Sequence, residues 1–192
     1  MRRRSGEAGF TLIEVVVVVG VIAVLAAILT PFITKYIEDS RRARAQNEAQ
    51  VVGAAVVNFY KDLGRWPNAN NTGAATITGL YTGPAGTPAP PTGFNGMGNW
   101  TGLTWDILNN HLVTNANNRY PTTGENRWQG SYATNLPVDP WGRPYVINAA
   151  AFTSVATPPA PVWVLSAGPN GTINTVQAAT AVGGDDVGYR IR

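Results

Sequence analysis

The chain has 192 residues, a formal net charge of +3 and a sequence pI near 9.4, values that first suggest a nucleic-acid-binding protein. The distribution of charge excludes that class: residues 66–192 carry five basic and five acidic side chains, so they hold no basic patch for a phosphate backbone. Cysteine is absent and histidine occurs once, which excludes disulfides, thiol catalysis and Cys/His zinc sites.

The N-terminal segment carries an apolar run of membrane-spanning length. Arg2, Arg3 and Arg4 precede it, and twenty residues from 15 to 34 carry no charge. A helix of that length reaches ~30 Å, the thickness of a bilayer's hydrocarbon core. The basic cluster predicts a cytoplasmic N-terminus and a head on the other side of the membrane.

A secretory signal peptide and a plain membrane anchor are the two simple interpretations of this run. A signal peptide has a shorter apolar region of ~7–15 residues and a small-residue cleavage site. A plain anchor leaves Glu14 unexplained, because a carboxylate within a membrane helix costs ~2.5–3.5 kcal/mol and usually has a partner. Cleavage after Gly9 would create one: Phe10 would gain a free amine four residues before Glu14. The two charges would attract strongly in a low-dielectric setting, within one subunit or between neighbours.

The hexapeptide from Gly9 to Glu14, GFTLIE, follows a short basic leader and precedes the apolar run. It resembles the type III signal of type IV pilins and of the pseudopilins of type II secretion. The resemblance implies that a prepilin peptidase cuts after Gly9 and N-methylates Phe10. It also implies that Glu14 pairs with a neighbour's N-terminus during assembly, and that Pro31 locally loosens the helix in the filament.

Helical periodicity continues beyond the apolar run. Val52, Val56, Phe59 and Leu63 recur at spacings of four, three and four, which places them on one helix face. Gly64 is a typical helix stop. We therefore expect one helix from Phe10 to Leu63, bent or melted near the proline. The resulting organisation is a leader (1–9), an apolar transmembrane and filament-core half (10–34), an amphipathic half (35–64) and a globular head (65–192).

The head is expected to be an α+β unit in which the long helix packs on a small antiparallel sheet, as in pilins. A short helix is predicted at Trp105–Leu112 with Thr104 as N-cap. Residues 68–129 are rich in turns and match no segment of the family. Strands are predicted at Ile77–Tyr81, Arg143–Asn148, Val162–Ser166 and Val187–Ile191.

Three segments of the chain sharpen the resemblance toward the major pseudopilin of type II secretion: residues 59–67, residues 136–145 and the C-terminal loop of residues 165–188. The last resembles that family's calcium loop. Asn170 stands where the family has aspartate, and residues 172–183 are longer than expected. The alternative is an uncharged turn with a solvated Asp pair. The candidate ligands implied are the carbonyls of Ala167 and Thr172 and the side chains of Asn170, Asp185 and Asp186.

The function expected is that of a non-enzymatic subunit of a helical filament in protein export. It would wait in the bacterial inner membrane, in contact with lipid and with its head in the periplasm, and then join a periplasmic or extracellular filament. The partners implied are other copies of the chain, the prepilin peptidase, an inner-membrane assembly platform and minor pilins or pseudopilins. Calcium is the only cofactor considered.

Two other functions stay open at this stage. One is a major type IV pilin that forms extracellular pili for adhesion, motility or DNA uptake. The other is a membrane-anchored, carbohydrate-binding adhesin, suggested by six Trp and seven Tyr. An enzyme is not expected, because His111 has no nucleophile motif near it and is interpreted as a surface or capping residue. Asp139, in the sequence Asp-Pro-Trp-Gly, is expected to cap local N–H groups rather than to act in catalysis.

Overall fold

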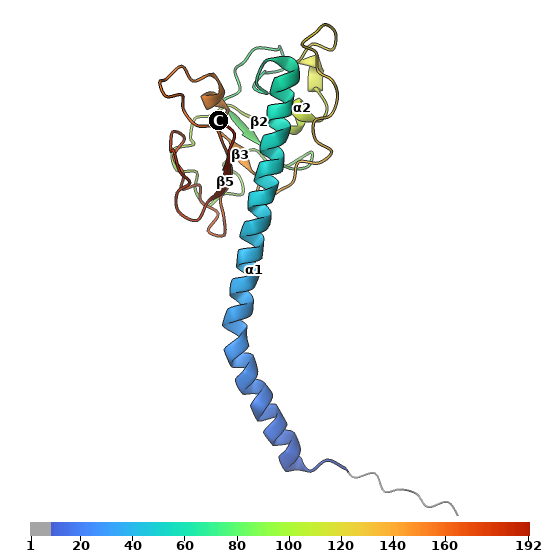
Figure 1. The fold of residues 1–192 in the computed structure, drawn as a ribbon, viewed down its shortest axis with the longest axis vertical. Coiled ribbons are helices and arrows are strands. Elements are labelled where there is room, and N and C mark those ends of the chain that lie inside the picture. Colours follow the sequence, from blue (N-terminus) through green and yellow to red (C-terminus); the bar gives the residue numbers. More distant parts are fainter. Residues whose placement is uncertain (1–8) are drawn as a thin grey trace, which may run out of the picture. The chain divides into compact units, whose positions relative to one another are not determined.

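The computed structural model describes residues 9–192 and has the α+β architecture expected from the sequence (Figure 1). Residues 1–8, most of the expected leader, lie outside the described residues. The chain divides into two compact units, Met1–Ser40 and Arg41–Arg192. Its elements in chain order are α1 (Leu12–Leu63), β1 (Gly79–Tyr81), β2 (Trp105–Ile107), α2 (Asn109–Leu112), η1 (Ala116–Asn118), β3 (Val146–Ile147), η2 (Ala149–Thr153), β4 (Trp163–Ser166) and β5 (Val187–Arg190).

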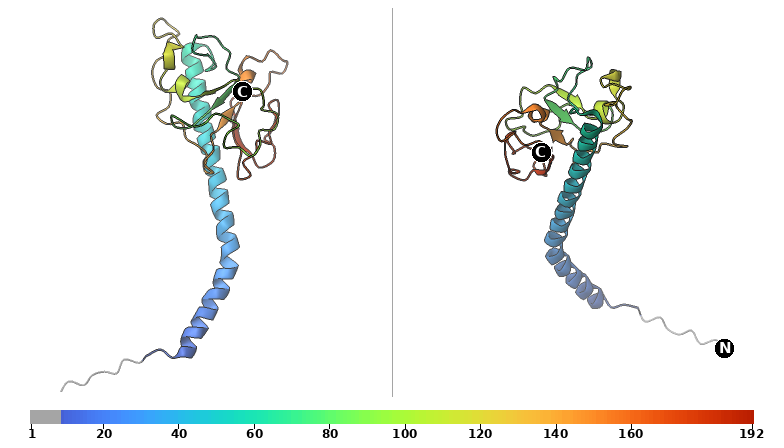
Figure 2. Two further views of the ribbon diagram at one scale, coloured as in Figure 1. Left: turned by 180° about the vertical axis from the view of Figure 1, so that it is seen from behind. Right: turned by 45° about the horizontal axis from the view of Figure 1, so that its top comes forward.

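Helix α1 ends at the predicted residue and begins at Leu12, two residues after the predicted start. Its 52 residues run without interruption through Pro31, so the helix is not melted there. Figure 2 shows that its N-terminal part bends instead. The hydroxyl groups of Thr30 and Thr34 donate to carbonyl oxygens of the preceding turn near this position, at 2.7 Å to Ala26 and 3.0 Å to Pro31.

The head contains a five-stranded sheet in the order β2-β1-β3-β4-β5. Strands β1, β3, β4 and β5 pair antiparallel with their neighbours, but β2 pairs parallel with β1. The sheet is therefore mixed, and the prediction of a wholly antiparallel sheet is wrong for its edge. The parallel pair is possible because residues 82–104 form a long connection that returns the chain to the start of β1.

Alternation along the short strands separates two apolar clusters. Leu80, Ile147 and Val164 face the C-terminal half of α1 and join its buried residues Val52, Val56 and Phe59. The opposite face of the sheet presents Tyr81, Val146 and Leu165 to a second cluster, which loop residues such as Trp100 and Ile173 complete. Both views of Figure 2 show this half of α1 beside the sheet. The predicted helix face is confirmed, because Val52, Val56, Phe59 and Leu63 are at most 3% exposed.

The prediction for residues 105–112 is wrong in its first half. Trp105, Asp106 and Ile107 form β2, and only Asn109–Leu112 is helical. Thr104 does not cap that helix: Leu108 occupies the N-cap position and makes no side-chain capping bond. The Thr104 carbonyl instead accepts the N–H groups of Thr78 and Gly79, which joins the start of β2 to the start of β1. Pairing with β1 therefore outweighs the helical preference of the segment.

The turn around Asp139 behaves as expected. Asp139 is 3% exposed, and its Oδ1 accepts the N–H groups of Trp141 at 3.0 Å and Arg143 at 2.7 Å. Its Oδ2 accepts the Ser166 hydroxyl of β4 at 2.6 Å. Gly142 supplies the left-handed conformation at φ +85°. The carboxylate thus ties the turn to the sheet, which is a structural role.

Candidate functional site

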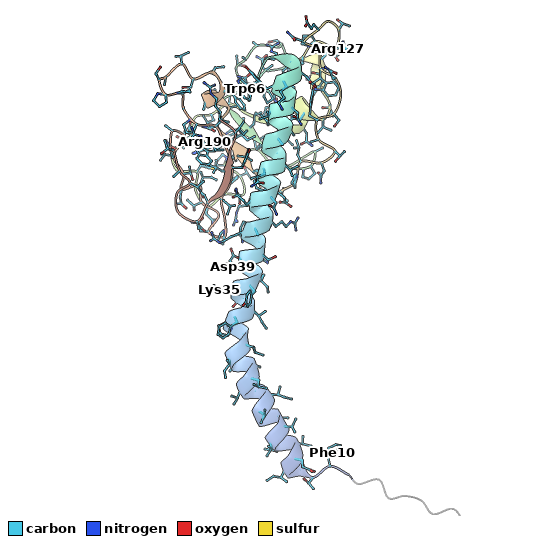
Figure 3. The ribbon with its side chains drawn as sticks, in the orientation of Figure 1. Phe10, Lys35, Asp39, Trp66, Arg127 and Arg190 are labelled. Carbon is cyan, nitrogen blue, oxygen red and sulfur yellow. The ribbon has the colours of Figure 1, made fainter. Side chains whose placement is uncertain are left out.

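The N-terminal end of α1 places Phe10 and Glu14 on open surface, as Figure 3 shows for Phe10. Gly9 and Phe10 precede the helix in an extended, exposed segment, and Phe10 is 86% exposed. The peptide bond expected to be cleaved is therefore accessible to a protease. The following apolar residues are exposed too: the most apolar 18-residue window of α1 has a mean hydropathy of 3.1, and none of it is buried. By length and composition α1 can cross a membrane.

Glu14 has a local partner that the sequence analysis missed. Its Oε2 accepts both the N–H and the hydroxyl of Thr11, each at 2.8 Å, and its own N–H donates to Thr11 Oγ1 at 3.3 Å. This reciprocal arrangement is a capping box, and the signal for it was the Thr-x-x-Glu spacing at the start of an apolar run. The carboxylate is thereby held at the positive end of the helix, one turn from Phe10.

The C-terminal loop brings together most of the expected metal ligands. Asn170 donates its N–H to Asp185 Oδ2 at 3.0 Å, and its Oδ1 accepts the N–H of Thr172 at 2.6 Å. Gly168, at φ +59°, lies so close to Asp185 that a Cβ atom there would collide with the Asp185 carbonyl. The two ends of the loop therefore meet at Asp185.

Asn174, which the sequence analysis did not single out, adds its side-chain amide to this cluster. In the orientation that satisfies its hydrogen bonds, the amide nitrogen donates to the Thr172 carbonyl oxygen and to Asp185 Oδ1, each at 3.2 Å. Asn174 therefore holds Thr172 and Asp185 together.

Asp186 contributes differently from its neighbour. Its Oδ2 accepts the N–H groups of Asn174 and Thr175 at 2.9 and 2.7 Å and the Thr175 hydroxyl at 2.7 Å. Its Oδ1 is buried and has no hydrogen-bond partner among residues 9–192. Burial raises the pKa of the Asp186 carboxyl, although these hydrogen bonds oppose the rise. The possible ligands are two carboxylates together with amide and carbonyl oxygens, which are the oxygen ligands that a hard cation prefers. The described part of the chain holds no cluster of three acidic or histidine side chains.

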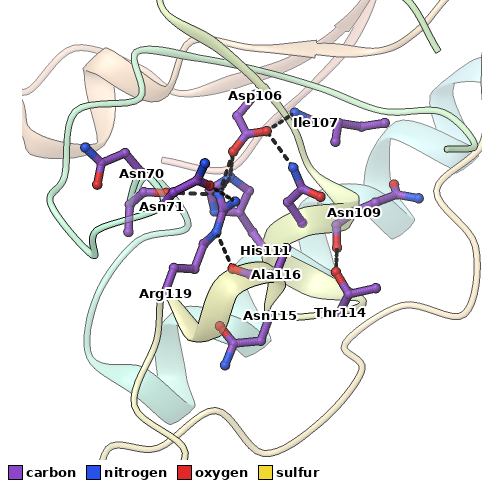
Figure 4. A network of polar contacts seen from close by, with 12 residues as sticks. Asn70, Asn71, Asp106, Ile107, Asn109, His111, Thr114, Asn115, Ala116 and Arg119 are labelled. Atoms are coloured by element: carbon purple, nitrogen blue, oxygen red, sulfur yellow. Dashed lines mark hydrogen bonds and ion pairs between the residues drawn. The ribbon is translucent and has the colours of Figure 1, made fainter. Parts of the chain in front are cut away.

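A third polar group surrounds His111 and corrects the expectation of a surface or capping residue. His111 is fully buried. Its Nδ1 lies 2.6 Å from the Tyr120 hydroxyl, and its Nε2 lies 3.3 Å from Asp106 Oδ2 and 3.2 Å from Arg119 Nη1 (Figure 4). Burial lowers the pKa of His111, and the Arg119 charge lowers it further while Asp106 opposes the change. Both ring nitrogens are occupied, so the imidazole cannot reach a substrate.

Arg119 and Asp106 form the ion pair at the centre of this group. Arg119 Nη1 donates to Asp106 Oδ2 at 2.5 Å and to the Ala69 carbonyl at 3.1 Å. Burial alone would raise the pKa of Asp106, but hydrogen bonds from His111 and Arg119 hold it well below its usual range. A signal for the pair was present in the sequence: Asp106 and Arg119 are the only charged residues between 66 and 125.

Comparisons with known proteins agree with this geometry. Residues 4–30 match the prokaryotic N-terminal methylation motif, and residues 110–184 match the model of type II secretion system protein G. The chain thus carries a prepilin-type methylation motif and a segment similar to type II secretion protein G. The first match covers the exposed apolar end of α1, and the second covers β3, β4 and the C-terminal loop up to residue 184, just before Asp185 and Asp186. No solved structure matches the chain.

Individual relatives divide between the two branches of the pilin and pseudopilin family. The type II secretion system core protein G of Pseudomonas aeruginosa is 26% identical over 145 residues, which cover 76% of this chain and 75% of that protein. Fimbrial protein EcpC of Eikenella corrodens is 40% identical over 77 residues, 39% of this chain and 50% of its own length. The toxin coregulated pilin of Vibrio cholerae is 30% identical over 74 residues, 38% of this chain and 33% of its own. The chain thus spans about half the length of EcpC and about a third of the toxin coregulated pilin.

Proposed function

We propose that the chain is the major pseudopilin of a type II secretion system, a structural subunit that polymerises into a helical filament and acts in protein export. The observation that carries the proposal is the uncharged, exposed apolar surface of residues 15–34, none of which is buried, with Glu14 at its start. Such a surface is stable only against lipid or against other apolar helices. The match of residues 110–184 to protein G selects the secretion branch of the family.

The capping box suggests how Glu14 acts in assembly. Before cleavage, the carboxylate is neutralised by its own helix terminus through Thr11. Cleavage after Gly9 places a new ammonium group, on Phe10, beside this acceptor. A neighbour's ammonium can then bind Glu14 Oε1, which makes no hydrogen bond within residues 9–192, while Thr11 keeps Oε2. Lipid contact is exchanged for helix contact at modest cost, and the ion pair sets the register of the subunits.

The proposed route begins in the inner membrane, with the basic N-terminus in the cytoplasm and the head in the periplasm. The prepilin peptidase removes the leader and methylates Phe10. The assembly platform and minor pseudopilins then recruit the subunit into a filament of identical copies. Pro31 is the position proposed to loosen when helices pack in the filament core, because it lacks the N–H that would hold that turn.

The test compares Glu14→Ala with Glu125→Ala, which removes the same side chain from an exposed part of the head. Filaments are imaged by electron microscopy in cells that express each variant, and membrane insertion is measured by fractionation. We expect Glu14→Ala to insert but not to assemble, and Glu125→Ala to do both. Assembly of Glu14→Ala at the wild-type level, or a native filament protein that retains residues 1–9 by mass spectrometry, would overturn the proposal.

A major type IV pilin is the second candidate, because fimbrial proteins reach 40% identity to part of this chain. The same images separate the two. Short filaments confined to the periplasm, with loss of an exported protein on deletion, support the pseudopilin; long extracellular fibres with normal export support the pilin.

We also propose that the C-terminal loop binds calcium through Asp185, Asn170, Asn174 and the Thr172 carbonyl, with Asp186 and the Ala167 carbonyl completing the site. The meeting of the Thr172 carbonyl, the Asn174 amide and Asp185, and the buried Asp186 Oδ1 that has no hydrogen-bond partner within residues 9–192, support this. At free calcium 100 times the Kd, binding would add ~2.7 kcal/mol, which raises the melting midpoint by about 5–10 °C. An equal midpoint in calcium and in chelator would exclude the site.

A further inference from the structure

The head contains a polar cavity that the filament function does not use. Its volume is about 330 Å³, and it lies where the loop of residues 70–71, the edge strand β2 and the segment around η1 meet. Asn70, Asn71, Asn110 and Asn117 line it together with Trp105 and Asp106. Its size is at the lower end of the ~300–1,000 Å³ typical of small-molecule sites.

Three of these asparagines are held at one end of the side-chain amide and open at the other. Asn71 Oδ1 accepts Arg119 Nη2 at 2.7 Å, and Asn110 Nδ2 donates to Asp106 Oδ1 at 2.8 Å. Asn70 Oδ1 accepts the N–H of Thr72 at 2.9 Å and that of Ala74 at 3.0 Å. Figure 4 shows Asn70 and Asn71 beside the Asp106–Arg119 pair. Within residues 9–192 the opposite ends of these amides make no hydrogen bond. The nitrogens of Asn70 and Asn71 are therefore available as donors to a ligand, and Asn110 Oδ1 is available as an acceptor.

The charge of the site points to an uncharged ligand. The Arg119 side chain is only 1% exposed, and its guanidinium already donates to Asp106, Asn71 and two carbonyl groups, so it offers no free cation to an anion. Asp106 is neutralised by the same contact. A ligand here therefore meets fixed neutral dipoles rather than a net charge, and it loses little hydration energy on binding.

Trp105 borders the cavity, but its indole lies on the other face of the sheet from the Asp106 side chain, because successive side chains of a strand point to opposite faces. The indole covers Gly79 of β1 and packs against the second apolar cluster. The cavity is therefore lined mainly by amide donors and acceptors, which suit the hydroxyl groups on the edge of a sugar ring. Peptide addition to the β2 edge fits less well, because the Ile107 N–H is already used by Asp106 Oδ1 at 2.8 Å.

We infer that this cavity binds a neutral saccharide, through the open amide ends of Asn70, Asn71, Asn110 and Asn117. The Asp106–Arg119 pair acts as a positioning pair, since it orients Asn110 and Asn71 and does not itself donate to the ligand. The inference does not depend on polymerisation, because every residue of the cavity belongs to one head.

The test uses the full chain in a detergent without a sugar headgroup, and saturation-transfer NMR with maltohexaose, cellohexaose, chitohexaose and a mannose tetrasaccharide. We expect at least one of these to bind with a Kd below 10 mM. Hexaglycine serves as the peptide probe. Absence of binding by all four saccharides at 10 mM, or binding of hexaglycine instead, would overturn the inference.

The chain offers a matched pair of variants. Asn117 and Asn118 are adjacent, exposed and both left-handed, at φ +58° and +50°, but only Asn117 lines the cavity. Replacement by glycine relieves the same backbone conformation at each position. We expect Asn117→Gly and Asn71→Ala to weaken saccharide binding at least tenfold, and Asn118→Gly to leave it within twofold. Equal effects of the two glycine variants would assign the binding to another surface.

Discussion

The Arg119–Asp106 pair allows a sharp prediction about the stability of the head. Arg119→Met keeps most of the apolar volume of the side chain but removes the guanidinium, which donates to Asp106, Asn71 and the carbonyls of Ala69 and Ala116. The Asp106 side chain is only 18% exposed and would be left without its cation. Removal of one partner of a buried pair costs ~3–5 kcal/mol. For a chain of this length the melting midpoint would fall by about 6–20 °C.

The assay is thermal unfolding of the full chain in detergent, followed by near-ultraviolet circular dichroism of the tryptophans, with Arg127→Met as the control on an exposed arginine. The double variant Arg119→Met/Asp106→Asn removes the stranded charge, so it should lose less stability than the two single variants added together, by about 1–3 kcal/mol. The only imidazole of the chain gives a second readout: its NMR pKa should rise in Arg119→Met, because the Arg119 charge lowers it in the native protein. A change in melting midpoint of under 2 °C with an unshifted imidazole would refute this reasoning.

Three further predictions concern the buried His111, the buried face of α1 at Phe59, and Asn170 in the C-terminal loop. The pKa of His111 is lowered in the folded state, so the unfolded chain binds more protons than the folded chain below about pH 6.5. The melting midpoint should therefore fall as the pH drops from about 6.5 toward 4, and it should be retained above about pH 7. A flat profile over that interval would contradict the burial of the imidazole. Phe59→Ala removes a fully buried ring that packs edge-on against Tyr120 at 4.8 Å and should cost ~3–5 kcal/mol, whereas Val51→Ala, at a 64% exposed position, should change stability by less than about 0.5 kcal/mol; comparable losses would mean that this helix face does not bind the sheet. Asn170→Asp adds a carboxylate to the C-terminal loop and should tighten calcium binding at least fivefold by isothermal titration, while Asn118→Asp should not; an unchanged affinity would remove Asn170 from the ligand set.

The saccharide site and the filament would act together if both proposals hold. Each subunit carries one cavity, so a polymer would present it at regular intervals, and weak binding at one site would become strong binding to a polysaccharide by multivalency. Cavity variants that still form filaments would separate the two properties, because Asn117 and Asn71 are distant in sequence from the assembly residues Phe10 and Glu14.

The sequence by itself determined the long helix and the chemistry of its end. An apolar run without charge, a lone glutamate and the four-and-three spacing of Val52, Val56 and Phe59 are local patterns, and local patterns decide helix formation and which face is buried. Strands β3, β4 and β5 followed from β-branched and aromatic runs for the same reason. The turn at Asp139 was predictable because its carboxylate bonds to N–H groups two and four residues away.

Only the tertiary structure decided the edge of the sheet and the polar clusters of the head. Residues 105–107 became a strand because β1 offered hydrogen bonds that no local preference could reveal. His111 was buried because reversal of the chain at η1 returned Arg119 to Asp106, thirteen residues earlier in the sequence. Asn174 and the saccharide cavity likewise depend on where separate loops meet, and such meetings are fixed by packing of the whole head rather than by the residues next to them.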